Sequence, residues 1–320
     1  MIGRALFLKG LLVATGGLDI WDPPDPGFPS APPSPAPVPV PVAPAVPGAA
    51  GNVIRVQLGD GTIETLDIEK YLYGVVPLES PPTWPAAALQ AQAIVARTYA
   101  LQKRTLSRAY DVVATDADQR YGGVAAEHPA SSAAVDATRG QTLAYLGGPA
   151  SVFYSACCGG HSADANELWG HAGLPYLRGV DDPYCTASPD YRWQRTLPLD
   201  RARAALADKL NGVPQAAELD DPDDSGRPRT VTFRGDGGSM LALSVSDVRS
   251  RFGSDTVRSL WLREIDFDRT QAVPLVVIEG SGRGHGVGLC QWGARGMALN
   301  GASAPAILAH YFPGTAVTGG

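Results

Sequence analysis

Glycine recurs at every second position from Gly280 to Gly288, within the stretch GSGRGHGVGLCQWGARGMA. A dinucleotide-binding loop needs the spacing Gly-x-Gly-x-x-Gly between a strand and a helix, and a P-loop needs a Lys-Ser or Lys-Thr pair. This stretch has neither feature, which argues against nucleotide binding. Alternating glycines instead permit unusual backbone angles and close approach by another segment or a ligand. We therefore expect something to lie against this backbone.

Three side chains near these glycines are candidates for binding. His285 has no bulky neighbour in the sequence, so it is either a structural histidine or a residue that faces a groove. Gln291 and Trp292 offer an amide and an aromatic face, a combination suited to holding sugar rings. The alternative is that both residues simply pack at the start of a helix.

The chain contains four cysteines, which are Cys157, Cys158, Cys185 and Cys290. Cys158 and His161 form a Cys-x-x-His pair, and His285 and Cys290 form a His-x4-Cys pair. If the fold brings these pairs together, they supply two sulfur and two nitrogen ligands for a tetrahedral zinc ion. The rival is a disulfide, for example between Cys158 and Cys185, which an oxidising compartment favours. The sequence alone does not choose between cysteine pairings.

Length and composition limit the class of protein. A chain of 320 residues is long enough for one large domain or two smaller ones, and its hydrophobic fraction of 44% excludes a largely disordered protein. Its net charge of −6 gives no general attraction to nucleic acid or to anionic lipid. We therefore expect no nucleic-acid partner. No long apolar run is present, so we expect no membrane span.

The N-terminal part differs from the rest of the chain. Residues 1–20 resemble a signal peptide, with Arg4 and Lys9 at a short apolar run, but Lys9 interrupts that run and no clear cleavage site follows. In residues 21–51 proline recurs so often that we expect a disordered, extended Pro-rich linker. The sequence therefore predicts a signal-like leader over 1–20, a linker over 21–51 and a folded domain over 52–320.

The elements that position the candidate residues are predicted by periodicity and by turn and cap residues. Alternation around a Gly-Asp-Gly turn predicts a hairpin over 53–68. An alanine-rich run, with Thr83 as N-cap and Pro85 in the first turn, predicts a long buried helix over 84–105. Strands are expected within 141–160, 229–244, 257–267 and 272–280, and short helices at 246–253, 290–301 and 304–312. The expected fold class is mixed α+β, strand-rich, with one long central helix and several short helices.

Three sequence blocks resemble a known family. The run GRGHGVGLCQWGARGMA, followed by AILAHYFPGT, resembles the C-terminal signature of the stage II sporulation protein D family, also called the amidase-enhancer domain family. YLYGVVPLESPPTWPAAALQAQAIVARTYAL resembles the N-terminal signature of that family. FYSACCGGHSADANELWG, with PYLRGV, resembles the middle. These blocks follow the order of the family and cover most of residues 53–318.

The resemblance implies an exported enzyme that processes peptidoglycan in the cell wall or periplasm. Family members act as lytic transglycosylases on glycan strands, some preferring strands without stem peptides, and some were first described as enhancers of cell-wall amidases. The implied partners are peptidoglycan glycan strands and a cell-wall amidase. No cofactor is required, but a structural zinc ion is compatible, since some members bind zinc near the middle block. The alternative is a non-catalytic wall-binding module that enhances an N-acetylmuramoyl-L-alanine amidase.

Glu79, in VPLESPPTW, matches the catalytic acid of this family. Apolar surroundings would raise its pKa and keep a proton available for a glycosidic oxygen. Ordinary glycosidases need two carboxylates. A lytic transglycosylase needs only one, because the 6-hydroxyl of the muramic acid attacks its own anomeric carbon and one carboxyl group can serve as acid and then as base. Taken without the motif, a glutamate before a helix is more often a cap or a solvated charge.

Further residues are expected to bind the substrate. Arg97 and Tyr99, in ARTYA, match the same motif. Arg97 is expected to anchor a lactyl carboxylate or to position Glu79 through a charge-assisted hydrogen bond, the alternative being an arginine at the core edge that bridges a helix and a strand. The remaining candidates for the walls of a glycine-lined cleft are Tyr73, Tyr154, Ser155, His285, Gln291 and Trp292.

Overall fold

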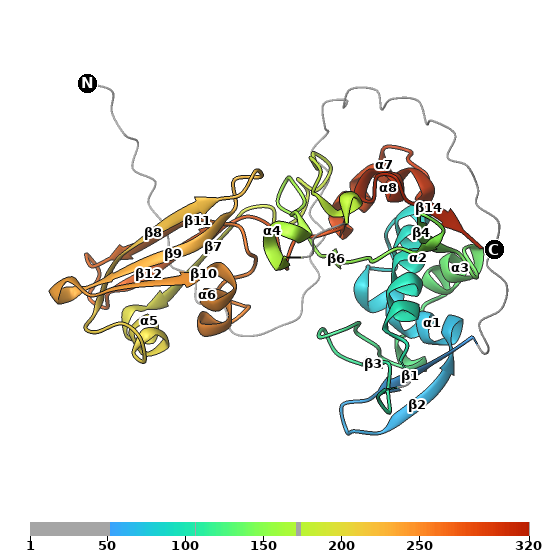
Figure 1. Ribbon diagram of the computed structural model, residues 1–320, viewed down its shortest axis with the longest axis horizontal. Helices are drawn as coiled ribbons and strands as arrows, with labels where there is room; N and C mark the ends of the chain where they lie inside the picture. Colours follow the sequence, from blue (N-terminus) through green and yellow to red (C-terminus); the bar gives the residue numbers. More distant parts are fainter. Residues whose placement is uncertain (1–51, 106, 171–173, 320) are drawn as a thin grey trace. The chain divides into compact units, whose positions relative to one another are not determined.

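The computed structural model describes residues 52–105, 107–170 and 174–319. The leader predicted over 1–20 and the linker predicted over 21–51 lie outside the described residues. These residues form helices and strands that are interspersed along the chain, which confirms the predicted mixed α+β class (Figure 1). None of the described helices combines the length and the apolarity needed to cross a membrane.

The predicted N-terminal hairpin is confirmed. β1 (Val53–Gln57) pairs antiparallel with β2 (Ile63–Asp67), and β3 (Val112–Val113) adds to β1 in parallel. Helix α1 (Ile68–Glu79) follows β2 directly, because the Asp67 side chain accepts hydrogen bonds from the first backbone N–H groups of the helix. The helix ends at Glu79, where the backbone becomes extended ahead of two prolines.

The long helix α2 (Ala86–Lys103) is buried between two hydrophobic clusters, as the alanine-rich sequence predicts. Ile94 and Val95 face one cluster, while Ala96 and Ala100 face the other. Small side chains let neighbouring elements approach on both sides of the helix. The predicted cap is wrong, however, because Pro85 occupies the N-cap position and no side chain caps the first turn.

The elements packed around α1 and α2 come from both halves of the chain (Figure 1). Strand β6 lies parallel to β13, and β14, β4 and β5 form a second small sheet. Helices α7 and α8, both predicted from the sequence, pack against α2. Their bounds, with those of the neighbouring short elements, are: η1 (Val124–Ala126), α3 (Pro129–Ala137), β4 (Thr142–Tyr145), β5 (Gly148–Pro149), β6 (Tyr154–Ser155), α4 (Ala165–Trp169), η2 (Pro175–Leu177), β13 (Leu289–Cys290), α7 (Gln291–Leu299), α8 (Ala304–Tyr311) and β14 (Ala316–Thr318).

The residues from Trp193 to Ile278 form a separate hydrophobic cluster. It contains one antiparallel sheet in the order β11-β12-β7 and another in the order β10-β9-β8, with α5 and α6. The β9–β10 hairpin, α6, β11 and β12 are all predicted from the sequence. The bounds are: β7 (Trp193–Pro198), α5 (Leu199–Leu206), β8 (Pro214–Pro222), β9 (Pro228–Gly235), η3 (Asp236–Gly238), β10 (Met240–Ser244), α6 (Val245–Phe252), β11 (Leu262–Asp268) and β12 (Leu275–Gly280).

A buried ion pair joins α1 to α2. The guanidinium of Arg97 donates from Nε and Nη2 to the two carboxylate oxygens of Glu69, at 2.9 and 2.6 Å, and both side chains are 1% exposed. Arg97 also donates to the carbonyl oxygens of Val135 and Gln141, while the Gly140 N–H donates to Glu69. The two charges are therefore surrounded by hydrogen bonds that tie α1, α2 and the end of α3 together.

The substitution Arg97→Met should destabilise the fold strongly, because it leaves the Glu69 carboxylate buried without a cation. We expect the free energy of unfolding to fall by about 3 to 5 kcal/mol, as measured by urea titration. Arg139→Met is the matched control, since Arg139 makes an exposed pair with Asp136 and its loss should change stability little. Equal urea midpoints for Arg97→Met and the wild type would contradict the structural role of the pair.

Candidate functional site

Glu79 is the last residue of α1, and its carboxyl group is held by neutral donors. The backbone N–H of Arg120 donates to Oε1 at 2.8 Å, and the Gln291 side-chain amide approaches Oε2 at 3.5 Å. Burial raises the pKa of Glu79 above its ordinary value of 4.5, and these hydrogen bonds only partly oppose the shift. The group therefore holds its proton more strongly than an exposed glutamate does.

The loop that supplies the Arg120 N–H is fixed on α1. The Tyr71 hydroxyl donates to the buried Gln119 side chain at 3.1 Å, and the rings of Tyr71 and Tyr121 are in contact. Gly74 makes this packing feasible, because a Cβ at that position would lie 2.7 Å from the Tyr121 ring. The loop thus presents its backbone N–H to Glu79 from a rigid support.

Gln291 joins three elements at the Glu79 carboxyl group. It is the first residue of α7, is nearly buried, and also donates to the Gln92 side chain of α2 at 3.3 Å. The Tyr154 hydroxyl, from β6, is buried and has no hydrogen-bond partner among the described residues. Burial and then the nearby charge of Glu79 raise the pKa of Tyr154 well above its usual value, which keeps this hydroxyl protonated.

An aromatic pair adjoins the Glu79–Gln291 contact along the chain. The rings of Trp84, which precedes α2, and Trp292, which follows Gln291, meet edge to face with centroids 5.2 Å apart. Both side chains are only partly buried, and the Arg295 guanidinium lies over the Trp292 ring. Partly exposed indole rings offer a flat apolar surface for sugar rings, and Trp292 directly follows Gln291, the residue that contacts Glu79.

Tyr99 also lies near Glu79, but its hydroxyl is engaged elsewhere. It donates to Asp118 at 2.8 Å, and burial, with Asp118 and Glu79 contributing, raises its pKa. Asp118 further accepts from the Val113 N–H at 3.0 Å and pairs with Lys103 at 3.1 Å. The structure therefore places Tyr99 at the edge of the site, in a network that uses Asp118 as an acceptor.

Three predicted substrate-binding residues are not placed where they would contact substrate at Glu79. Arg97 binds Glu69 in the buried ion pair and so neither positions Glu79 nor is free to bind a lactyl group. The Tyr73 hydroxyl donates to Asp136 at 2.7 Å on the α3 side of α1. Ser155 is buried on β6, with no hydrogen-bond partner for its hydroxyl among the described residues.

The glycine stretch lies against another part of the chain rather than forming the wall of a cleft at Glu79. Gly282, Gly284, Gly286 and Gly288 all have positive φ, between 72° and 96°. A Cβ at Gly282 would lie 2.5 Å from the Cys157 carbonyl oxygen, and Arg283 and Cys157 exchange backbone hydrogen bonds. The expectation of close approach is confirmed, and the segment that approaches is the middle block of this chain.

His285 belongs to a different surface from Glu79. Its ring contacts those of Phe153 and Trp169, and Nδ1 accepts a hydrogen bond from the Val287 N–H at 3.0 Å. Burial lowers the pKa of His285 to about 4, so the imidazole is neutral at neutral pH. It lines a hollow of about 470 Å³ together with Trp169 and Arg249.

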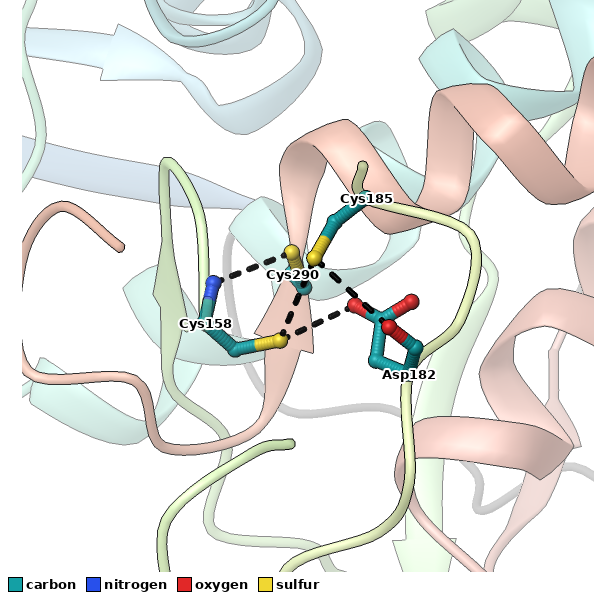
Figure 2. Close-up of side chains that lie close together, drawn as sticks. All are labelled: Cys158, Asp182, Cys185 and Cys290. Carbon is teal, nitrogen blue, oxygen red and sulfur yellow. Dashed lines mark hydrogen bonds between the residues drawn. The ribbon is translucent and has the colours of Figure 1, made fainter. Parts of the chain in front are cut away.

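The cysteines converge, but not with the histidines that the sequence pairs with them. Figure 2 shows Cys158, Asp182, Cys185 and Cys290 pointing toward one another, and one ligand atom from each lies within 4.8 Å of all the others. All four side chains are buried, and the sulfurs of Cys158 and Cys185 are 3.7 Å apart without a bond.

The predicted zinc ligand set is therefore not assembled. His161 turns away from Cys158, with Nδ1 2.6 Å from its neighbour's carbonyl oxygen at Ser162 and Nε2 3.8 Å from Asp181. His285 lies with Trp169 instead. Of the proposed Cys158, His161, His285 and Cys290 set, only the two cysteines meet.

Several residues of the Glu79 site and of the cysteine cluster were not predicted from the sequence. Arg120 acts through its backbone, and Asp118 lies in the same irregular loop, so neither belongs to a periodic pattern. Gln92 stands among alanines on a buried helix, where a polar residue is itself a signal that could have been used. Asp182 precedes a cysteine by three positions, but no spacing rule connects it to Cys290.

Comparisons with known proteins agree with the family blocks. The family model described as a stage II sporulation protein matches residues 58–145. An uncharacterized protein of Brachyspira hyodysenteriae is 33% identical over 255 residues, which cover 79% of this chain and 67% of that protein. The stage II sporulation protein D of Bacillus subtilis is 26% identical over 274 residues, covering 80% of this chain and 76% of that protein.

A further relative carries a different name. The amidase enhancer of Bacillus subtilis is 29% identical over 296 residues. The match covers 77% of this chain but 40% of that relative, so this chain corresponds to less than half of the amidase enhancer.

The raised pKa of Glu79 should make the stability of the wild type depend on pH. A carboxyl group whose pKa is raised by folding contributes stability below its unfolded pKa and loses that contribution as pH rises through its folded pKa. Glu79→Gln should therefore become progressively more stable relative to the wild type as pH rises above the ordinary glutamate pKa of 4.5. Urea unfolding at several pH values measures this difference. Glu127→Gln, at an exposed position, is the control, and a difference for Glu79→Gln that stays flat across the range would count against a buried carboxyl group.

Proposed function

Because the chain belongs to the stage II sporulation protein D and amidase-enhancer family, we propose that it acts on cell-wall peptidoglycan as a lytic transglycosylase. The substrate is the glycan strand of alternating MurNAc and GlcNAc, including strands without stem peptides. Glu79 is the general acid and base. The observation that carries the proposal is one half-buried carboxyl group with a raised pKa and neutral hydrogen-bond donors, one of which, Gln291, directly precedes a partly exposed tryptophan.

The chemistry needs one carboxyl group that is protonated first and ionised later. Protonated Glu79 gives its proton to the glycosidic oxygen as the bond from that oxygen to the MurNAc anomeric carbon breaks. The 6-hydroxyl of the same MurNAc then attacks the anomeric carbon, and the Glu79 carboxylate takes up the hydroxyl proton. The products are a 1,6-anhydro-MurNAc end and a free GlcNAc end, and no water is consumed.

The surroundings of Glu79 suit both halves of this cycle. Burial favours the protonated form at the start. The Arg120 N–H and the Gln291 amide stabilise the carboxylate once the proton has left, and the charge of Arg120 opposes the rise of the Glu79 pKa without cancelling it. Tyr154 places a buried hydroxyl near the same carboxyl group, and burial keeps that hydroxyl protonated.

The second candidate, from another class, is a wall-binding module that enhances an N-acetylmuramoyl-L-alanine amidase. The relative named amidase enhancer favours it. Both candidates require export to the cell wall or periplasm, and both use the exposed indole rings to bind glycan. They differ in whether the proton of Glu79 is needed.

Glu79→Gln should abolish the chemistry while preserving binding. The amide has the size of the acid but cannot donate the proton, so we expect the rate of 1,6-anhydro-MurNAc formation from denuded glycan to fall by about 100-fold to 10,000-fold. Mass spectrometry of the products measures it. Glu127→Gln should cleave at the wild-type rate. Wild-type protein that forms no anhydro ends would overturn the enzymatic proposal, and amidase stimulation that survives in Glu79→Gln would favour the second candidate.

Trp84→Ala should weaken glycan binding more than it slows the chemical step. Loss of about 1 kcal/mol of ring contact raises KM by about fivefold, with kcat nearly unchanged. Trp169→Ala is the control, since Trp169 lies with His285. If kcat fell and KM stayed constant in Trp84→Ala, Trp84 would support the Glu79 site instead of holding sugar.

A further inference from the structure

The cluster of Cys158, Asp182, Cys185 and Cys290 gathers metal-binding groups from three separate segments. Cys158 follows β6, Asp182 and Cys185 lie in the loop after η2, and Cys290 ends β13 (Figure 2). The four side chains are at most 2% exposed. Such a convergence of three sulfurs and one carboxylate, far apart in the sequence, is not produced by any local turn.

The spacing of the cluster fits a tetrahedral ion. Zinc–sulfur bonds of about 2.3 Å place two sulfur ligands about 3.8 Å apart at tetrahedral angles. The sulfurs of Cys158 and Cys185 are 3.7 Å apart, and Cys158 Sγ lies 3.0 Å from an Asp182 carboxylate oxygen. Small side-chain adjustments therefore suffice for all four groups to face one ion.

The Asp182 carboxyl group is buried and has no cationic partner among the described residues. Its side chain is 0% exposed. It accepts from the Tyr184 N–H and the Cys158 thiol, and no ion pair among the described residues includes it. Buried carboxylates are normally paired or bound to a metal. The hydroxyl of Tyr311, also buried and without a hydrogen-bond partner in the part of the chain that the structure describes, flanks the same side of Gly293 as the Asp182 carboxylate.

The sulfur of Cys290 faces backbone hydrogen-bond donors, as a metal-bound sulfur does. Its sulfur accepts hydrogen bonds from the backbone N–H groups of Cys158, at 3.2 Å, and Gly293, at 3.3 Å. It also caps the N-terminus of α7, where the helix dipole favours negative charge. Backbone donors of this kind orient a sulfur ligand and stabilise it once a metal ion is bound.

We propose that Cys158, Asp182, Cys185 and Cys290 bind one structural zinc ion. Binding deprotonates the three thiols, so three protons leave as the ion enters, and the four protein ligands close the coordination sphere to solvent. This set replaces the cysteine and histidine pairs expected from sequence spacing. The ion pins the start of α7 to the middle block, and so fixes Gln291, the residue after Cys290, where it meets Glu79.

A buried arginine supports the charge of this site. Three thiolates and one carboxylate exceed the charge of one Zn²⁺, so the filled site is anionic. Arg227 is 4% exposed, and its guanidinium donates to the Cys158 carbonyl oxygen at 2.9 Å and to that of His161. A cation held in this way offsets part of the excess negative charge and orients the Cys158 backbone.

Zinc content of the full chain tests the proposal. Protein purified without chelator or added metal should carry one zinc per chain by inductively coupled plasma mass spectrometry. Cys158→Ser, Cys185→Ser, Cys290→Ser and Asp182→Asn should each lose most of it. Cys157→Ser is the matched control and should keep its zinc, since the Cys157 sulfur lies outside the four-atom group.

A second measurement needs no variant and so does not depend on variant folding. The wild type, exchanged with Co²⁺, should show thiolate-to-cobalt charge transfer in the near ultraviolet. X-ray absorption at the zinc edge should give three sulfur neighbours and one oxygen. Neither readout involves glycan, so failure of the zinc site and failure of the transglycosylase proposal are separate results.

Three outcomes would overturn the zinc site as proposed. In the first, the protein carries no zinc and the denatured chain has two free thiols instead of four, which indicates a disulfide. Protein without zinc and with four free thiols holds an unfilled cluster. In the third, zinc has four sulfur neighbours and is lost from Cys157→Ser, which would mean that Cys157 is the fourth ligand and Asp182 is not.

Discussion

The buried ion pair between Arg97 and Glu69 is the interaction on which the rest of the Glu79 side of the molecule depends. Two opposite charges are stable in a low-dielectric interior only when their geometry is good and their remaining donors and acceptors are filled. Here Arg97 and Glu69 meet through two hydrogen bonds, and backbone groups from the end of α3 complete their needs. This requirement fixes α1 relative to α2. Glu79 at the end of α1 and Gln92 on α2 therefore face each other through Gln291 without any direct tether.

The acid character of Glu79 arises from burial and not from a neighbouring negative charge. In a pair of carboxylates, repulsion raises one pKa and lowers the other, so the two groups divide the roles of acid and base. In this chain, Asp118 is occupied by Tyr99, Val113 and Lys103. Glu79 is left as one group whose affinity for a proton is raised by desolvation and lowered by its hydrogen-bond donors and the charge of Arg120. That balance suits a reaction in which one group first gives and later takes a proton.

The regular elements could be predicted from the sequence, whereas the contacts between them could not. Alternation and turn residues locate the first hairpin, and alanine content locates α2, because these signals are local. The family motif includes Arg97, but no sequence pattern says which carboxylate an arginine pairs with. That Arg97 pairs with Glu69 and not with Glu79 is determined by the tertiary structure. Spacing likewise pairs Cys158 with His161, yet the side chain of His161 turns toward Ser162 and Asp181. Asp182 joins the sulfurs only because β6, the loop after η2 and β13 are folded together.

One contact at Glu79 does not depend on which side chain the sequence places at the donor residue. The Arg120 hydrogen bond comes from the peptide group, which every residue except proline possesses. Changes of the side chain at this position leave the donor in place, and only a change in the path of the loop removes it. The identity of residue 120 therefore carries almost no information about this bond. Two related chains can share this hydrogen bond while having different residues at position 120. An alignment of their sequences would then show a difference where the structures share a contact.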